Sequence, residues 1–340
     1  MNGDLMRREM DEQPEVLRRI ADSAAETQAR VRAIVPEHLD GIALVGRGSS
    51  DNAAVLGRYA TELAAHRPAG LVAPSLHTRY ISPVDYRGYL VIGLSQSGAT
   101  PEVVATCERL RASGAVVIVI TNDNSSALVA ISDLALSTDA GAELAVPATK
   151  TVTAEMALLL VVAGALGDGL PEANGLAAVP NAVAAVLSDD LSAAMLAAHW
   201  ARHERLLVTA RGLAYAAALE TALKLKETTR IFAEGISIAD LLHGPIAAVG
   251  AGVPVLNIDG GDPIANDSRQ LVERLEPLGA PIATCSPDPK STLPMPGGLA
   301  EVMYTIVATV RGQQLARHLS LARGLDPDHP SGLTKVTPTH

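Results

Sequence analysis

Residues 91–100 read Val-Ile-Gly-Leu-Ser-Gln-Ser-Gly-Ala-Thr. The apolar start predicts a strand that ends in a loop of small hydroxyl residues. Pro101 follows, and proline is favoured at the first position of a helix, so Thr100 is a natural N-cap. A strand, a Ser/Gly loop and a helix N-terminus direct backbone N–H groups and a positive dipole at one spot, which suits a phosphate. An ordinary capped helix would use the same residue types, so both interpretations stand.

Two common nucleotide-binding patterns are absent from this sequence. The loop has no GxxxxGK[ST] motif and no lysine in its turn, so it is not a P-loop. Gly46-Arg47-Gly48 begins a dinucleotide fingerprint, but Asp51 stands where the third glycine belongs. We therefore expect the loop to hold the phosphate monoester of a small molecule.

Composition restricts the class of protein. The chain has 340 residues, of which 48% are hydrophobic and 19% charged, as in globular proteins. A formal net charge of −10 argues against nucleic acid as a partner. Cys107 and Cys285 are too few for a disulfide framework, the first 16 residues lack an apolar signal core, and the longest apolar run, 156–166, is too short to cross a bilayer. We expect a cytoplasmic protein that does not bind a membrane.

Strand-like and helix-like segments alternate along the chain, which predicts α/β domains with mostly parallel sheets buried on both faces. The Gly/Pro/Asn-rich stretch 164–181 is expected to connect two such domains, and the composition after Gly324 predicts a disordered end. Strands are expected at 42–46, 70–73, 90–94, 115–121, 133–137, 205–210, 253–258 and 281–285. Helices are expected near 52–65, 101–110, 213–229 and 299–322.

One predicted helix carries a possible acid–base group. Glu220, Lys224 and Glu227 are spaced i, i+4, i+7 and share a helix face. A lysine between two carboxylates could hold one of them ready as a base. Spacing alone favours the other interpretation, a solvated face with weak salt bridges.

The remaining titratable candidates are histidines and single lysines. His243 lies in a Leu-Leu-His-Gly-Pro segment, where it could act as an acid or base near neutral pH or only complete a turn. His199 and His203 have an HxxxH spacing without a third ligand, so we expect helix surface and no metal site. Residue type and position alone place Lys150 and Lys335 on the surface.

Taken together, these segments resemble the sugar isomerase (SIS) family. The resemblance is strongest to the isomerase half of glucosamine-6-phosphate synthase and to stand-alone SIS-type glucosamine-6-phosphate deaminases, and it covers nearly the whole chain. The matching segments are 10–14, 48–50, 94–100, 140–143, 148–150, 222–227, 242–245 and 333–337.

The resemblance implies two tandem SIS domains, each a flavodoxin-like, doubly wound, mostly parallel sheet flanked by helices. It also implies a homodimer whose active site is shared, because the family's histidine loop comes from the neighbouring subunit. The implied divisions are an N-terminal helical segment (1–38), a first SIS domain (39–180), a second SIS domain (181–324) and a C-terminal tail that closes the active site (325–340).

The resemblance also implies a role for each candidate residue. Glu227 would move a proton between C1 and C2 of the sugar, His243 would open and close its ring, Lys335 would reach the C2 carbonyl, and Lys224 would assist. Ser49 and Val146 would lie along the sugar. Its phosphate would be held by Ser50, Ser95, Gln96, Ser97 and Thr100. Chemistry through an enol-type intermediate requires no metal and no redox cofactor.

The expected reaction converts glucosamine 6-phosphate to fructose 6-phosphate and ammonia, because the sequence shows no glutaminase segment. Ala99, Ala148 and residues 239–242 depart from the family pattern and leave the identity of the sugar open. A fructosamine-6-phosphate deglycase, another phosphosugar aldose–ketose isomerase and a non-catalytic sugar-phosphate sensor are the alternatives.

Overall fold

The computed structural model describes residues 2–335, the side chain of residue 173 excepted. The chain forms two compact units. The N-terminal unit comprises residues 15–143 and 150–177, and the C-terminal unit comprises residues 2–14, 144–149 and 178–335. Each unit contains one five-stranded sheet.

The sheet of the N-terminal unit is wholly parallel and has the strand order β2-β1-β3-β4-β5. This is the doubly wound order: the chain first adds a strand on one side of β1 and then, from β3 onward, adds strands on its other side. Its strands are β1 (Gly41–Val45), β2 (Ala69–Leu71), β3 (Tyr89–Leu94), β4 (Val116–Thr121) and β5 (Leu134–Ser137).

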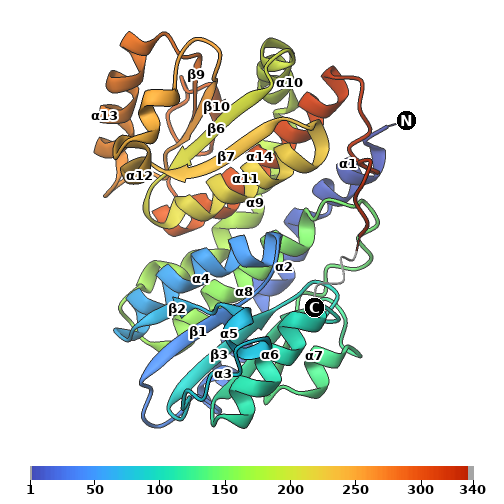
Figure 1. The fold of residues 1–340 in the computed structure, drawn as a ribbon, viewed down its shortest axis with the longest axis vertical. Coiled ribbons are helices and arrows are strands. Elements are labelled where there is room, and N and C mark those ends of the chain that lie inside the picture. Colours follow the sequence, from blue (N-terminus) through green and yellow to red (C-terminus); the bar gives the residue numbers. More distant parts are fainter. Residues whose placement is uncertain (1, 336–340) are drawn as a thin grey trace. The chain divides into compact units, whose positions relative to one another are not determined.

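Helices cover both faces of this sheet (Figure 1). On one face, Val91 packs with Val103, Cys107 and Leu110 of α6. On the other face, α4 packs against α8. Gly57 lets α4 lie close to β1, because a Cβ at Gly57 would lie 2.6 Å from the side chain of Leu44. The helices are α2 (Gln13–Asp22), α3 (Ala24–Arg32), α4 (Ser49–Ala65), α5 (Pro74–Thr78), α6 (Pro101–Ala112), α7 (Ala127–Ala130), α8 (Lys150–Leu166) and the 3-10 helix η1 (Pro171–Ala178).

The C-terminal unit repeats the same topology. Its sheet has the order β10-β9-β8-β6-β7, and all of its strands are parallel. Read from β7, this is again the doubly wound order, with the reversal between β6 and β8. The strands are β6 (Arg205–Ala210), β7 (Phe232–Ser237), β8 (Val255–Ile258), β9 (Ile282–Ser286) and β10 (Leu293–Pro294).

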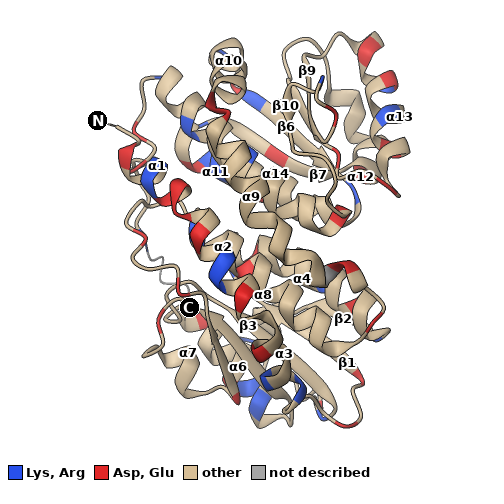
Figure 2. Ribbon diagram, turned by 180° about the vertical axis from the view of Figure 1, so that it is seen from behind, with Lys and Arg blue, Asp and Glu red and all other residues tan. Residues whose placement is uncertain are grey.

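A long central helix, α14, organises the C-terminal unit. It is buried from Val302 to Ala316 and packs against α9, α10 and α11. Figure 2 shows α9 without a charged residue, as expected for a helix that packs in the interior. The helices are α1 (Asp4–Asp11), α9 (Val179–Ser188), α10 (Asp190–Trp200), η2 (Gly212–Ala214), α11 (Tyr215–Thr229), α12 (Ile238–Leu242), η3 (Pro245–Ala248), α13 (Ala265–Leu275), η4 (Glu276–Leu278) and α14 (Glu301–Ala322).

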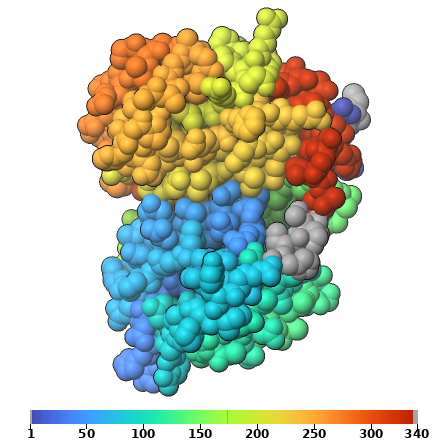
Figure 3. Space-filling model, viewed as in Figure 1, coloured from blue at the N-terminus to red at the C-terminus, as the bar shows by residue number. Residues whose placement is uncertain are grey.

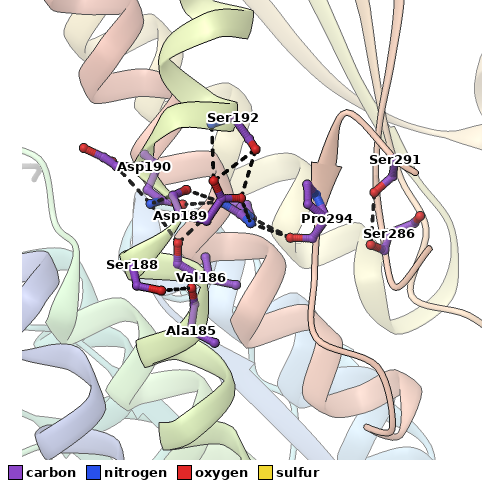
Figure 4. Close-up of polar contacts among 11 residues, drawn as sticks. Ala185, Val186, Ser188, Asp189, Asp190, Ser192, Ser286, Ser291 and Pro294 are labelled. Carbon is purple, nitrogen blue, oxygen red and sulfur yellow. Dashed lines mark hydrogen bonds and ion pairs between the residues drawn. The ribbon is translucent and has the colours of Figure 1, made fainter. Parts of the chain in front are cut away.

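A buried arginine joins α14 to its neighbours. The guanidinium of Arg311, whose side chain is 2% exposed, lies 2.8 Å from the Asp189 carboxylate. It also donates to the carbonyls of Asp189 and Pro294, at 2.7 and 3.0 Å. Asp189 in turn caps α10 by accepting from the Ser192 amide (Figure 4). The network therefore ties the junction of α9 and α10, strand β10 and α14 together.

Residues 323–335, which follow α14, pack against the first helix. Asp328 accepts hydrogen bonds from the amides of Leu5 and Met6, at 3.1 and 2.8 Å. The first helix and this segment lie side by side in Figures 1 and 3. The expected disorder is wrong for 325–335, because Asp328 supplies acceptors that composition does not reveal. The rest of that segment, 336–340, lies outside the described residues.

Among the described residues, no single helix combines the length and apolar character needed to cross a membrane. Only a pair bent by 54°, residues 174–188 and 190–200, meets that test when taken together.

Candidate active site

The first reversal of strand order, between β1 and β3, places two loops at one edge of the N-terminal sheet. Ligands of open α/β sheets bind in the crevice beyond the carboxyl ends of such strands. The loop after β1 leads directly into α4 at Ser49, and Ser50 is buried. Gly46 is required for this tight turn, because a Cβ there would lie 2.8 Å from the Ser50 backbone.

The loop after β3, residues 95–100, is held by its own hydroxyl groups and by β4. The hydroxyls of Ser95 and Thr100 are 3.1 Å apart, and Ser97 Oγ accepts from the Ala99 amide at 3.3 Å. The Gln96 carbonyl accepts from the Asn122 amide at 3.0 Å. The loop is therefore fixed before any ligand arrives.

Thr100 occupies the predicted N-cap position of α6, but its side chain does not cap the helix. Its hydroxyl faces Ser95 instead. Gly98 adopts φ of +58°, and a Cβ there would lie 2.1 Å from Ser126 Oγ, so only glycine fits. The hydroxyls of Ser95 and Thr100 thus lie in the loop that leads into α6, and the anion site there remains a prediction.

An ion pair joins the two loops. Arg47, in the loop after β1, lies 2.9 Å from Glu102 in the first turn of α6. The Arg47 side chain is 39% exposed and that of Glu102 12%. The pair is neutral overall, and it was not predictable because its members are separated by 55 positions in the sequence.

Ser50 has a buried carboxylate as its partner. Its hydroxyl donates to Glu155 Oε1 at 2.9 Å, and Glu155 on α8 is 1% exposed. Motif reasoning missed Glu155. The signal in the sequence that could have revealed it is that Glu155 is a single carboxylate in a mostly apolar helix.

Lys150, at the start of α8, is 1% exposed, so its expected surface position is wrong. Its Nζ lies close to Gly141, where a Cβ would be 3.9 Å away. Nearby, Glu143 accepts from the amide and hydroxyl of Thr151, at 3.2 and 2.7 Å.

Helix α11 of the C-terminal unit carries the predicted acid–base group. Lys224 Nζ lies 2.5 Å from Glu227 and 3.4 Å from Glu220. Burial alone would lower the pKa of Lys224, but the charges of Glu220 and Glu227 outweigh it and raise that pKa. The side chains of Lys224 and Glu220 are 1% and 0% exposed, whereas Glu227 is 23% exposed. The interpretation as a solvated face is therefore wrong, and Glu227 is the accessible end of a buried charge cluster.

Lys335 and Val146 come together from distant parts of the sequence. Lys335 Nζ donates to the Ala145 carbonyl at 2.8 Å. The amide of the adjacent Val146 donates to the Asp328 carbonyl at 3.0 Å. Lys335 is half-buried rather than a free surface side chain.

His243 ends α12 and is exposed. Its amide donates to the Asp240 carbonyl at 3.1 Å, and Gly244 follows with φ of +133°, so the loop turns sharply here. Among residues 2–335, no group of three or more His, Cys, Asp or Glu side chains is arranged to hold a metal ion.

The predicted site residues thus fall in two sets. The N-terminal unit holds Ser49 and the five residues expected to bind phosphate, whereas the C-terminal unit holds the expected acid–base residues and Val146. The roles of both sets remain predictions.

The second reversal of strand order, between β6 and β8, has a different chemistry. The pKa of Glu301 is raised from 4.5 to about 7, chiefly by burial and also by the charge of Asp259, while a hydrogen bond from the Leu213 amide opposes the rise. Burial also raises the pKa of Asp259. Two carboxyl groups therefore lie at this crevice, where the first crevice has the hydroxyl groups of Ser95 and Thr100.

Comparison with known proteins agrees with this duplicated architecture. The SIS domain family matches residues 39–165 and 200–294. A glutamine–fructose-6-phosphate aminotransferase [isomerizing] of Thermococcus kodakarensis is 32% identical over 97% of this chain and 57% of the relative. The chain thus spans about half the length of the curated relatives it matches.

Solved structures show the same fold. The C-terminal domain of glucosamine-fructose-6-phosphate aminotransferase from Francisella tularensis has a TM-score of 0.84 at 26% identity, covering 96% of this chain and 98% of that one. Glucosamine-6-phosphate deaminase from Thermotoga maritima has a TM-score of 0.71 at 22% identity, covering 94% and 99%. With two matched segments and two sheets of identical topology, the chain belongs to the SIS domain family and contains two SIS domains in tandem.

Proposed function

We propose that this chain is a phosphosugar isomerase of the SIS family that interconverts glucosamine 6-phosphate with fructose 6-phosphate and ammonia. The observation that carries the proposal is the charge cluster of α11, in which Lys224 holds Glu227 at 2.5 Å and leaves that carboxylate accessible. The hydroxyl-lined loop after β3 supports it as a cradle for the phosphate. The names of the relatives support the substrate class.

The proposed chemistry is proton transfer without an external oxidant or reductant. His243 assists ring opening, and Glu227 removes the proton from C2 of the open sugar and returns it to C1. The resulting C2 imine is hydrolysed by water, which supplies the ketone oxygen and releases ammonia. Lys335 assists at C2, and the ammonium of Lys224 stabilises the Glu227 carboxylate in position.

The phosphate anchor would hold the substrate while its first two carbons react. Binding energy from a group that does not react can be used to position the one that does. Ser49 and Val146 would contact the sugar.

We further propose that the active form is a homodimer in which the His243 loop completes the site of the second copy. The exposure of His243 supports this arrangement. Light scattering after size exclusion tests it, because a monomer with full activity would contradict it.

The direct test is incubation of the purified protein with glucosamine 6-phosphate in the absence of glutamine. Ammonia and fructose 6-phosphate should form in equal amounts. The same assay over a panel of phosphorylated amino sugars and fructosamine 6-phosphates identifies the substrate. A folded protein that binds these compounds and turns over none of them would reject the proposal.

A further inference from the structure

The buried pair of Ser50 and Glu155 has too few donor hydrogens for Ser50 to bind a phosphate as proposed. Ser50, which is 7% exposed, donates its only hydroxyl hydrogen to Glu155 at 2.9 Å. A serine hydroxyl has one hydrogen to donate, and an ionised carboxylate only accepts. The oxygens of a phosphate dianion also only accept. Ser50 therefore cannot donate to Glu155 and to a bound phosphate at the same time.

Two physical effects favour a proton on Glu155 when phosphate binds. Glu155 is 1% exposed on α8, and burial disfavours the charged form of a carboxyl group. An arriving phosphate dianion adds repulsion between like charges, which is weakly screened in the interior. A protonated carboxyl group can donate to Ser50 Oγ and release the Ser50 hydrogen for the phosphate.

We propose that Glu155 takes up a proton when a phosphate ester binds to the loops after β1 and β3, and then donates a hydrogen bond to Ser50. Glu155 is thus a positioning residue that acts through Ser50. The inference rests on the proposed function in one respect, namely that the ligand of these loops is a phosphate ester.

Other charged groups of the N-terminal unit could compete for this role. Asp51, next to Ser50, is the strongest competitor, because burial raises its pKa and Arg47 lowers it only in part. Lys150, on the same helix as Glu155, is buried. Helices α4 and α3 and strand β4 pack against α8. β4 contributes no titratable group. The other titratable side chains of α3 and α4 are Arg58, Tyr59, Glu62, Glu26, Arg30 and Arg32, which are exposed except for the half-buried Tyr59.

Calorimetry measures the proton uptake directly. Fructose 6-phosphate is titrated into the full-length protein at pH 8 in buffers of different ionisation enthalpy, without ammonia. The ester is mostly a dianion at this pH, because its second pKa is about 6. The wild type should take up about 0.5 to 1 proton per site, and its Kd should rise by up to about tenfold per pH unit above neutrality.

Glu155→Gln is the decisive variant, because its amide donates without titrating. It should take up almost no proton and show a nearly constant Kd between pH 7 and 8.5. Asp51→Asn is the matched control and should retain the wild-type uptake. Uptake that persists in Glu155→Gln, or that is lost in Asp51→Asn instead, would overturn the inference.

Further outcomes separate this inference from the proposed function. If Glu155→Gln does not fold, Glu155→Met replaces it, because it also removes the titratable group: the loss of uptake there supports the inference, and retained uptake refutes it. Binding with Glu155-dependent uptake but no turnover of glucosamine 6-phosphate refutes the enzymatic function alone. A wild-type protein that does not bind fructose 6-phosphate refutes both.

Discussion

The ammonium of Lys224 lies 2.5 Å from Glu227, one helical turn further along α11, while Glu220 approaches the same ammonium from the other side at 3.4 Å. The raised pKa of Lys224 keeps this cation charged across the neutral range. A buried cation with two carboxylates fixes the position of the accessible one. Such preorganisation is what proton transfer at carbon requires.

Replacement of Glu227 tests the assigned base. Glu227→Gln should lower kcat by about two to four orders of magnitude, because the amide cannot accept the proton, while KM changes by less than about threefold. Steady-state kinetics with glucosamine 6-phosphate measures both. Lys226→Gln, at an exposed neighbouring position, is the control and should behave as the wild type. Equal activity of Glu227→Gln and the wild type would exclude Glu227 as the base.

The hydroxyls of the loop after β3 should affect binding more than chemistry. Thr100→Ala or Ser97→Ala should raise KM about five- to twentyfold and leave kcat within about threefold, because the phosphate is held alike in the ground and transition states. Ser113→Ala, at the opposite end of α6, should change neither constant. A large fall in kcat at constant KM would contradict the anchoring role.

Loss of the buried Arg311 should destabilise the C-terminal unit. Arg311→Met leaves Asp189 and several buried carbonyls without their cation, so the free energy of unfolding should fall by about 2–4 kcal/mol. Urea titration measures the change. Arg87→Met removes an ion pair whose side chains are 82% and 53% exposed, and should leave the free energy of unfolding nearly unchanged. Equal effects of the two substitutions would mean that the network adds no stability.

Glu301 should make stability depend on pH. Its pKa is raised from 4.5 to about 7 in the folded protein, so the folded state keeps a proton that the unfolded state has lost. Stability from this group is therefore present below about pH 4.5 and is lost as the pH rises to about 7. Relative to the wild type, Glu301→Gln should show a smaller decrease in Tm between pH 5 and pH 8.

Thermal unfolding at several pH values measures this difference. Glu276→Gln, an exposed carboxylate of the same unit, should retain the wild-type profile. If the decrease in Tm over this range is the same in Glu301→Gln and in the wild type, the pKa of Glu301 is not raised by burial.

The parallel strands were predictable because their signal is local. Continuous Val/Ile runs mark β3 and β4, and both lie within a residue or two of the expected ranges. β7 was missed because an edge strand that includes Glu234 and Gly235 lacks such a run. Helix α9 was missed because it begins inside the stretch 164–181, which was expected to be a connection, and of α10 only the end near His199 was expected to be helical.

The positions of the candidate loops were predictable where their residues are contiguous in the sequence, and the roles of those residues remain predictions. The loop after β3 and the start of α6 lie as expected, because strand, loop and helix are contiguous. Burial was not predictable from spacing, so the cluster around Lys224 looked like a solvated face. The pair of Ser50 and Glu155 was also hidden, because its members are separated by 105 residues and only α4 packing on α8 brings them together.

The carboxylates at the second reversal of strand order have a consequence for the history of the chain. Two sheets of one topology indicate an ancestral duplication, yet the second crevice carries the carboxyl groups of Asp259 and Glu301 where the first carries the hydroxyls of Ser95 and Thr100. Neither crevice then provides the groups of the other, so one half of the chain cannot replace the other half. Selection on such a chain acts on two specialised halves rather than on a redundant pair.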